Sequence, residues 1–242
     1  MARIGIIGNE GRMGQALARA IAEAGHESSG GVGRGGDVAG LADHSDALLD
    51  FSSPAALESN LHAAIGAGIP LLVGTTGLEE RHHAAIDSAA GAIPVLQTGN
   101  TSLGVTLLAH LVREAARRLG PDWDVEVLEM HHRMKVDAPS GTALLLGEAA
   151  AEGRGMDFYA ANGPARYDRN GRREEGTIGF ASLRGGTVAG EHSVILAGPS
   201  ERLTLSHSAE DRMIFAHGAI RGAQWLIGRP AGRYTMPEVL GL

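Results

Sequence analysis

The stretch Arg3-Ile4-Gly5-Ile6-Ile7-Gly8-Asn9-Glu10-Gly11-Arg12-Met13-Gly14 decides the fold of the N-terminal half. It opens as a short β-branched apolar run, passes through a turn with glycines spaced G-x-x-G-x-x-G, and enters a segment with apolar residues at helical spacing. A strand, a glycine turn and a helix in this order favour dinucleotide binding. The glycines let the backbone approach a pyrophosphate, whose charge then lies over the helix N-terminus.

The nucleotide preference depends on the residues around this turn. The commoner spacing is G-x-G-x-x-G, and Glu10 stands here in place of the middle glycine. An acid at the end of the second strand normally binds the ribose hydroxyls of NAD, but Gly30-Gly31-Val32-Gly33-Arg34 offers none before Asp37. Arg34 can face the 2′-phosphate of NADPH, or it can be an ordinary exposed arginine. The sequence favours NADPH and allows NADH.

Three further apolar runs, at residues 47–54, 70–77 and 93–100, each end in small polar residues, and residues 55–67 between the first two have helical character. Alternating strands and helices are typical of a parallel, doubly wound sheet, which binds its ligands at the carboxyl ends of its strands. We therefore expect the three strand ends to line one crevice.

A charged stretch follows the strand expected over residues 123–129. Glu129-Met130-His131-His132-Arg133-Met134-Lys135-Val136-Asp137-Ala138-Pro139-Ser140-Gly141-Thr142 brings two imidazoles and an ammonium within five positions. Imidazole exchanges protons near neutral pH, and the N–H groups at the start of the helix expected over 142–152 favour anions. The stretch predicts protonation of a small anionic substrate, although paired histidines alone can also form a solvated, charged loop.

The remaining pattern predicts a second domain. After an excursion loop at 153–175, runs at 177–184, 193–197 and 201–207 joined by glycine turns suggest an antiparallel sheet. A last helix near 214–227 is expected to return to the first domain. The predicted fold is α/β, with an N-terminal Rossmann-like doubly wound parallel sheet and a C-terminal α+β domain with an antiparallel sheet. Residues 1–102 and 210–242 would form the dinucleotide-binding domain, and residues 103–209 the domain for substrate binding and oligomerisation.

Composition narrows the function classes. The chain of 242 residues is 43% hydrophobic, and its net charge of −7 argues against a nucleic-acid-binding surface. It has no cysteine, which excludes disulfides, thiolate metal sites and cysteine nucleophiles. The adjacent histidines lack the spacing of helix-borne zinc ligands, so no metal is expected. With no apolar run long enough for a membrane span and no signal peptide, we expect a cytoplasmic protein.

The long histidine motif, of the form E-x-H-H-x-x-K-x-D-x-P-S-G-T, closely resembles that of the 4-hydroxy-tetrahydrodipicolinate (dihydrodipicolinate) reductase family. Gly8-x-x-Gly-Arg-Met-Gly at the N-terminus is also similar, and the likeness extends through Ile178-Gly179-Phe180 and Gly190-Glu191-His192. The resemblance implies an NAD(P)H-dependent oxidoreductase of lysine and diaminopimelate biosynthesis. Such an enzyme reduces a cyclic imine that carries two carboxylates, and it acts as a homotetramer.

The resemblance also implies roles for individual residues. His131 would be the catalytic acid/base and Lys135 its proton-donating partner, while the substrate carboxylates would meet His132, Ser140, Gly141 and Thr142. Thr101 stands where the family often has an aromatic residue, so its contact with the nicotinamide would differ. The expected cofactor-binding residues, for NADPH or NADH, are Gly8, Asn9, Glu10, Gly11, Arg12, Met13, Arg34, Gly74, Thr75, Thr76, Thr98, Gly99, Asn100 and Thr101.

Two other functions share parts of this pattern. A dehydrogenase that acts on an imino acid would share the first half, but should lack the histidine loop with its Pro-Ser-Gly-Thr segment. A nucleotide-sensing module would use the glycine turn without transferring hydride, and has no need for His131 together with Lys135. Consumption of reduced cofactor with freshly generated substrate separates these classes.

Overall fold

The computed structural model describes residues 1–160, 163–167 and 171–242, so part of the loop expected over 153–175 lies outside the described residues. The chain forms two compact units. One comprises Met1–Leu103 with Arg212–Leu242, and the other comprises Gly104–Asp211. The first unit is thus assembled from both ends of the chain.

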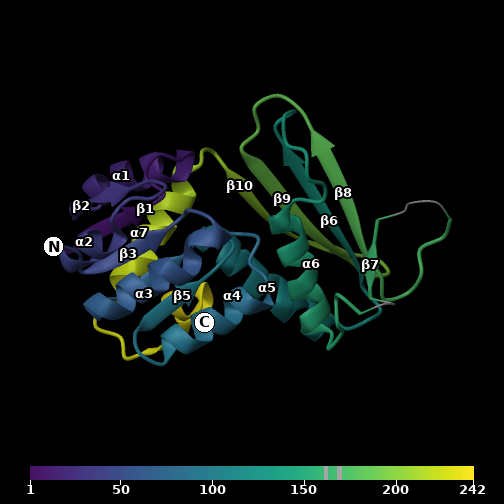
Figure 1. The fold of residues 1–242 in the computed structure, drawn as a ribbon. Helices are drawn as coiled ribbons and strands as arrows, with labels where there is room; N and C mark the ends of the chain where they lie inside the picture. Colours follow the sequence, from purple (N-terminus) through teal and green to yellow (C-terminus); the bar gives the residue numbers. More distant parts are fainter. Residues whose placement is uncertain (161–162, 168–170) are drawn as a thin grey trace. The chain divides into compact units, whose positions relative to one another are not determined.

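The first unit is built on a six-stranded parallel sheet with the order β11-β5-β4-β3-β1-β2. Figure 1 labels its strands β1, β2, β3 and β5. β2 and β11 form its two edges. The strands are β1 (Arg3–Ile7), β2 (Glu27–Val32), β3 (Ala47–Asp50), β4 (Leu71–Val73), β5 (Pro94–Gln97) and β11 (Gly232–Tyr234).

Helices cover both faces of this sheet, which explains why its central strands read as unbroken apolar runs. Successive residues of a strand point to opposite faces. Accordingly Leu48 and Leu71 pack with α2, α3 and α4, whereas Leu49 and Leu72 pack with α1, α7 and α8. The helices are α1 (Arg12–Glu23), α2 (Val38–Asp43), α3 (Leu57–Ala67), which follows the 3-10 turn Pro54–Ala56, α4 (Glu80–Ala90), α7 (Met213–Leu226) and α8 (Met236–Leu240).

The second unit contains a five-stranded sheet with the order β10-β9-β6-β8-β7. The helices α5 (Leu103–Leu119) and α6 (Gly141–Gly153) pack on one of its faces around a core that includes Val125, Val127 and Phe180. The strands are β6 (Asp124–His131), β7 (Ala165–Arg166), β8 (Ile178–Arg184), β9 (Gly190–Ala197) and β10 (Arg202–Ala209).

This second sheet is mixed, where the sequence suggested an antiparallel meander. β9 pairs antiparallel with β10 and β6, but β8 pairs parallel with β6 and β7. The chain passes through α6 between β6 and β8, and a helical crossover lets the next strand run in the same direction as the first. β6 therefore lies between β8 and β9, which are neighbours in sequence but not in the sheet.

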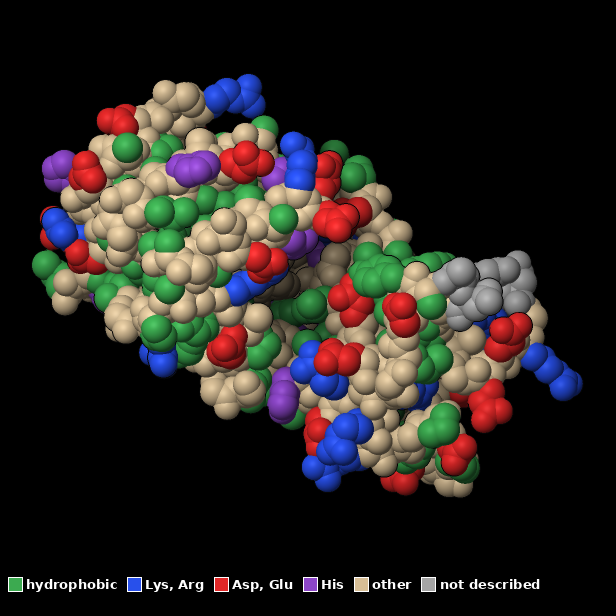
Figure 2. Space-filling view, turned by 60° about the horizontal axis from the view of Figure 1, so that its bottom comes forward, with side chains coloured by type: hydrophobic (Ala, Val, Ile, Leu, Met, Phe, Trp, Pro, Cys, Tyr) green, Lys and Arg blue, Asp and Glu red, His purple; other side chains and the backbone are tan. Residues whose placement is uncertain are grey.

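The surface carries charges of both signs. Figure 2 shows lysine and arginine side chains scattered among aspartate and glutamate over the face in view. None of the described helices combines the length and the apolar character needed to cross a membrane.

Candidate active site

The passage from β1 into α1 requires glycine at two positions, Gly8 in the turn and Gly14 in the first turn of the helix. Gly8 has a φ of +90°, and a Cβ built on it would lie 2.6 Å from the carbonyl oxygen of Phe51. A Cβ on Gly14 would lie 2.4 Å from the Cα of Asn9 and equally near the carbonyl oxygen of Gly8. Gly11 is the N-cap of α1 and provides no side-chain cap. The start of α1 therefore retains the backbone donors that suit a phosphate.

A cavity of about 650 Å³, here called the glycine-turn cavity, lies against this turn. Four predicted cofactor-binding residues line it: Gly8, Glu10, Gly11 and Arg34. Asn9 and Arg12 do not line it. The side chain of Asn9 lies against Gly31, and Arg12 is exposed at the first position of α1.

A second cavity of about 360 Å³, the strand-end cavity, opens at the carboxyl ends of β3, β4 and β5. Its lining includes every predicted residue of segments 74–76 and 98–101, together with Met13. The two predicted turns therefore meet in one cavity, together with aromatic rings from two other segments. The lining residues are Met13, Phe51, Ser52, Gly74, Thr75, Thr76, Thr98, Gly99, Asn100, Thr101 and Phe215.

A buried carboxylate fixes the shape of the strand ends. Asp50, at the end of β3, is fully buried and accepts hydrogen bonds from the N–H and hydroxyl of Ser52 at 3.0 and 2.6 Å. It also accepts from the amide of Asn60 at 2.9 Å and the hydroxyl of Thr75 at 3.2 Å. Sequence reasoning did not single out this network. Asp50 holds the turn after β3 against the turn after β4.

Thr101 is buried, and its hydroxyl donates to the carbonyl oxygen of Phe215 at 2.6 Å. This bond ties the 98–101 turn to α7. The neighbouring Gly218 of α7 permits the approach, because a Cβ there would lie 1.8 Å from the carbonyl oxygen of Thr101. Phe215 supplies an aromatic ring to the strand-end cavity, where Thr101 has none.

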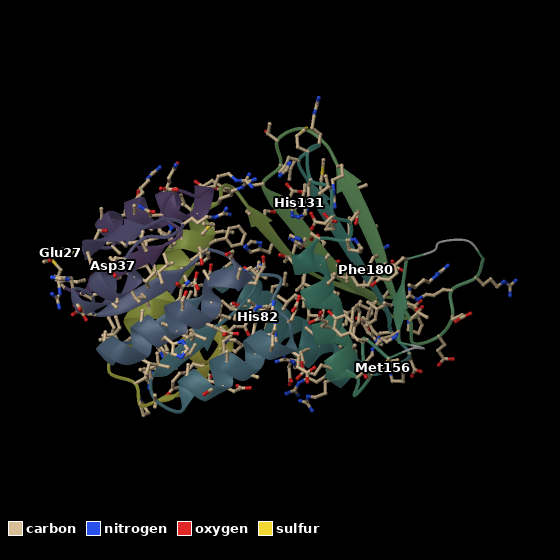
Figure 3. All side chains as sticks on the ribbon, in the orientation of Figure 1. Glu27, Asp37, His82, His131, Met156 and Phe180 are labelled. Atoms are coloured by element: carbon tan, nitrogen blue, oxygen red, sulfur yellow. The ribbon has the colours of Figure 1, made fainter. Side chains whose placement is uncertain are left out.

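In the second unit, His131 ends β6, as labelled in Figure 3. It is paired with Glu129. The two side chains share the buried face of the strand, and the Nδ1 of His131 lies 2.5 Å from a carboxyl oxygen of Glu129. Burial pushes the pKa of Glu129 up, but hydrogen bonds from Arg184, Ser182 and His131 outweigh it and lower that pKa to about 2. The carboxylate is therefore an acceptor only, so the Nδ1 of His131 carries a proton and Nε2 is the nitrogen left to exchange one.

Arg184 holds the other side of this carboxylate. From the end of β8, its guanidinium donates to both carboxyl oxygens of Glu129 at 2.8 Å and to the carbonyl oxygen of Asp137 at 2.7 Å. A two-pronged contact of this kind fixes the plane of the carboxylate. Glu129 is only 1% exposed, so its charge is balanced by protein donors, chiefly Arg184 and His131, and not by water.

Room at Nε2 of His131 depends on a glycine. Gly190 opens β9, and a Cβ on it would lie 3.1 Å from that nitrogen. The imidazole is 8% exposed, so it is largely desolvated. Any larger residue at position 190 would crowd the nitrogen that can carry the exchanged proton.

A second imidazole, His192, packs edge-on against His131 with ring centres 5.0 Å apart. Burial lowers the pKa of His192 to about 4, and the charge of His131 acts in the same direction. The ring is thus neutral near pH 7, and its Nε2 lies 3.0 Å from the hydroxyl of Ser140. That hydroxyl also accepts from the N–H of Ala143 as the N-cap of α6.

The predicted substrate-binding residues gather at the start of α6 and in the loop before it. Ser140 is buried, with its side chain bound to His192 and its N–H donating to Glu129 at 3.2 Å. Gly141 and Thr142 are the first two residues of α6. The backbone N–H of His132 donates to Val188, and the ammonium of Lys135 lies 2.8 Å from the carboxylate of Asp137.

Three residues of this cluster received no role from the sequence. Glu129 was quoted only as the start of the motif, His192 only as part of the resemblance, and Arg184 only as the last residue of a strand-like run. The alternating pattern of β6 did indicate that Glu129 lies beside His131, because residues 125, 127, 129 and 131 occupy one face of a strand. No local pattern connects Arg184 to Glu129, 55 residues away.

A metal centre is not evident in this cluster. Within residues 1–160, 163–167 and 171–242, no group of three or more histidine, aspartate or glutamate side chains is arranged to hold an ion. The two imidazoles near Glu129 are instead bound to protein oxygens.

Known protein families match both parts of the chain. Residues 2–101 match the family model described as "Dihydrodipicolinate reductase, N-terminus", and residues 104–240 match "Dihydrodipicolinate reductase, C-terminus". The 4-hydroxy-tetrahydrodipicolinate reductase of Zymomonas mobilis is 52% identical over 247 residues, which cover 99% of this chain and 97% of the relative. The protein of the same name from Acidiphilium cryptum is 48% identical, and the match covers 99% of this chain and 98% of the relative.

Solved structures share the fold. A dihydrodipicolinate reductase from a Paenisporosarcina species, solved with dipicolinate bound, superposes with a TM-score of 0.76 at 20% identity over 98% of both chains. The diaminopimelate dehydrogenase of C. glutamicum gives a TM-score of 0.53 at 13% identity, covering 99% of this chain and 95% of that one.

Proposed function

Because the chain belongs to the dihydrodipicolinate reductase family, we propose that it reduces 4-hydroxy-tetrahydrodipicolinate to tetrahydrodipicolinate for lysine and diaminopimelate biosynthesis. The enzyme is an oxidoreductase with a Rossmann-type fold for a nicotinamide dinucleotide. The observation that carries the proposal is the buried Glu129–His131 pair, with its exchangeable nitrogen kept open by Gly190.

The first unit fits the cofactor. Its glycine turn admits no side chain at positions 8 and 14, and the two cavities beside it suit the two halves of a dinucleotide. The glycine-turn cavity would hold the adenosine half, and the strand-end cavity would hold the nicotinamide against residues 98–101 and Phe215. Bound NADH or NADPH supplies the hydride.

His131 is the proposed acid/base. Overall, the substrate gains a hydride and a proton and loses one water, so the chain must handle protons as negative charge develops on the imine. The Glu129 carboxylate accepts the proton on Nδ1 and fixes the plane of the imidazole, which leaves Nε2 as the nitrogen that exchanges a proton with the substrate. Lys135 is the proposed proton-donating or charge-stabilising partner, and Asp137 competes for its ammonium until an anionic substrate arrives.

The substrate carboxylates are proposed to bind at the start of α6. Gly141 and Thr142 supply backbone and hydroxyl donors, and His132 supplies a third contact from the loop. Ser140 is proposed to support this site without offering its hydroxyl, because that hydroxyl already caps α6 and binds His192. Its proposed role is to fix the position of the start of α6 relative to Glu129, to which its N–H donates.

The test replaces His131 by glutamine. With freshly generated substrate, kcat should fall by roughly 10²–10⁴-fold, while the dissociation constants of NADH and NADPH stay near those of the wild-type protein. Loss of cofactor binding without a specific loss of turnover would reject the role of His131. If the wild-type protein consumes no reduced cofactor with this substrate but does so with an imino acid, the proposed reaction itself is wrong.

The proposal includes a homotetramer formed through the open face of the second sheet. On that face, opposite the one packed by α5 and α6, lie Leu128, Met130, Ala181, Leu183 and Ile195, and Leu183 is 49% exposed. Apolar side chains grouped on an exposed sheet face mark protein interaction surfaces.

A further inference from the structure

The end of β2 offers no carboxylate to a ribose. In doubly wound folds, an acid at this point usually accepts hydrogen bonds from the hydroxyls of the adenosine ribose. Here β2 ends at Val32 and is followed by Gly33. The next acid, Asp37, is the N-cap of α2, where its carboxylate accepts from the N–H of Gly40 at 2.9 Å. Asp37 does not line the glycine-turn cavity.

A carboxylate nevertheless lies at this place, and it comes from a different segment. A Cβ built on Gly33 would lie 2.6 Å from the Cδ of Glu10, and 2.7 and 2.9 Å from its two carboxyl oxygens. The carboxylate of Glu10 therefore fills the space that a side chain at position 33 would enter. Glu10 belongs to the glycine turn and stands where the commoner motif has its middle glycine.

Glu10 and Arg34 face the same ligand space. Both residues line the glycine-turn cavity, and both have exposed side chains. Within the described part of the chain, neither side chain forms a hydrogen bond or ion pair that would hold it away from a ligand. A carboxylate and a guanidinium are thus both available beside the position of the adenosine ribose.

We propose that Glu10 has taken over the ribose-binding role of the missing acid after β2, and that Glu10 and Arg34 together set the nicotinamide preference. The proposal rests on the dinucleotide binding proposed above. The Glu10 carboxylate accepts from the 2′- and 3′-hydroxyls of NADH and repels the 2′-phosphate of NADPH. Arg34 attracts that phosphate. With both groups present, the chain binds either cofactor.

The experiment measures the dissociation constants of NADH and NADPH by titration calorimetry, without substrate. In Glu10→Gln, NADH should bind about 10-fold more weakly, while NADPH binds as before or more tightly. In Arg34→Gln, NADPH should bind about 10- to 100-fold more weakly, with NADH little changed. Glu80→Gln is the matched control: it removes the same charge from the first turn of α4, outside both cavities, and should change neither constant.

A transposition tests the position of the carboxylate. Glu10→Gly alone should lose NADH affinity, and adding Gly33→Glu should restore it to within about 3-fold of wild type by returning the acid to the end of β2. Gly33 is not among the glycines with positive φ, so the new side chain brings no backbone strain. Failure of the double variant to recover NADH binding, while NADPH still binds, overturns the proposal.

Equal weakening of both cofactors by Glu10→Gln, or no change in either, also overturns it. These outcomes are separate from failure of the proposed reaction. If the wild-type protein binds both cofactors with the expected dependence on Glu10 and Arg34 but does not turn over the substrate, the assignment of Glu10 stands and the proposed reaction falls.

Discussion

At the scale of single residues, one carboxylate connects the chemistry of the second unit to its stability. Glu129 accepts from His131 on one side and from Arg184 on the other, with almost no exposure to solvent. Replacing it by glutamine keeps the volume but removes the charge that orients and stabilises the imidazole. We expect kcat of Glu129→Gln to fall at least about 10-fold, but by less than the roughly 10²–10⁴-fold of a variant that lacks the proton carrier.

Glu129→Gln should also lower the free energy of unfolding by about 1–3 kcal/mol, because Arg184 loses its charged acceptor. Steady-state kinetics and denaturant unfolding measure the two effects. Arg184→Gln serves as the companion variant, since it disturbs the same carboxylate without touching His131. Unchanged kcat in both variants would show that the imidazole needs no orientation from this pair.

His192 gives the protein a pH-dependent stability. Its pKa is lowered to about 4 in the folded state, against 6.5 for an unperturbed histidine. The neutral ring's contribution is therefore complete above about pH 6.5 and is lost as the pH falls from there toward 4. Between pH 7 and pH 5, the wild-type protein should lose on the order of 2 kcal/mol more than His192→Gln, as measured by denaturant unfolding. Parallel curves for the two proteins would contradict this assignment.

The sequence could propose candidate residues where the side chains concerned lie close together along the chain. The motif at residues 129–142 predicted roles in proton transfer for His131 and Lys135, because few structural roles need imidazoles and an ammonium so close together. Contacts between distant segments were not accessible in the same way. Arg184 on Glu129, Phe215 in the strand-end cavity and Glu10 beside Gly33 all depend on how strands and turns come together in space.

At the scale of elements, the turn from β1 to α1 is the most constrained connection of the first unit. A methyl group on Gly14 would collide with backbone atoms of Asn9 and Gly8, which cannot move aside as a flexible side chain can. Gly14→Ala should weaken binding of both NADH and NADPH by at least about 10-fold and lower the melting temperature, because the start of α1 is displaced.

Gly66→Ala is the matched control for this prediction. Gly66 lies inside α3, and a Cβ there meets no atom within 4 Å. Alanine is the better helix former, so this variant should gain about 0.5–1 kcal/mol and bind both cofactors normally. Calorimetry of both variants decides the matter: normal cofactor binding by Gly14→Ala would show that the turn tolerates displacement.

The elements were predictable to different degrees. Strands buried on both faces read as continuous apolar runs, and the helix expected over 142–152 differs from the observed α6 by one residue at each end. Sheet order was less accessible, because three glycine-punctuated strands read equally well as a meander. The parallel pairing of β6 with β8 follows from the crossover through α6, which relates segments about 50 residues apart.

At the scale of the whole molecule, the open face of the second sheet leads to a prediction about assembly. A homotetramer of this 25.0 kDa chain has a mass of about 100 kDa. Leu183→Glu places a charge in the proposed interface and should give smaller species by size-exclusion chromatography with light scattering.

Leu203→Glu is the control from the same sheet. Leu203 is 39% exposed but pairs with the core residue Leu196, so its side chain lies on the face that packs with the helices. This variant should retain the tetramer. A wild-type monomer, or equal dissociation of both variants, would contradict the proposed interface.

The split origin of the first unit has a consequence for synthesis on the ribosome. β11 closes one edge of the parallel sheet, and α7 fills the core on one face, yet both are translated only after the whole of the second unit. The middle unit is continuous and can fold while translation proceeds. Until α7 and β11 emerge, the nascent N-terminal sheet has an open β5 edge and an uncovered apolar face, features that attract chaperones.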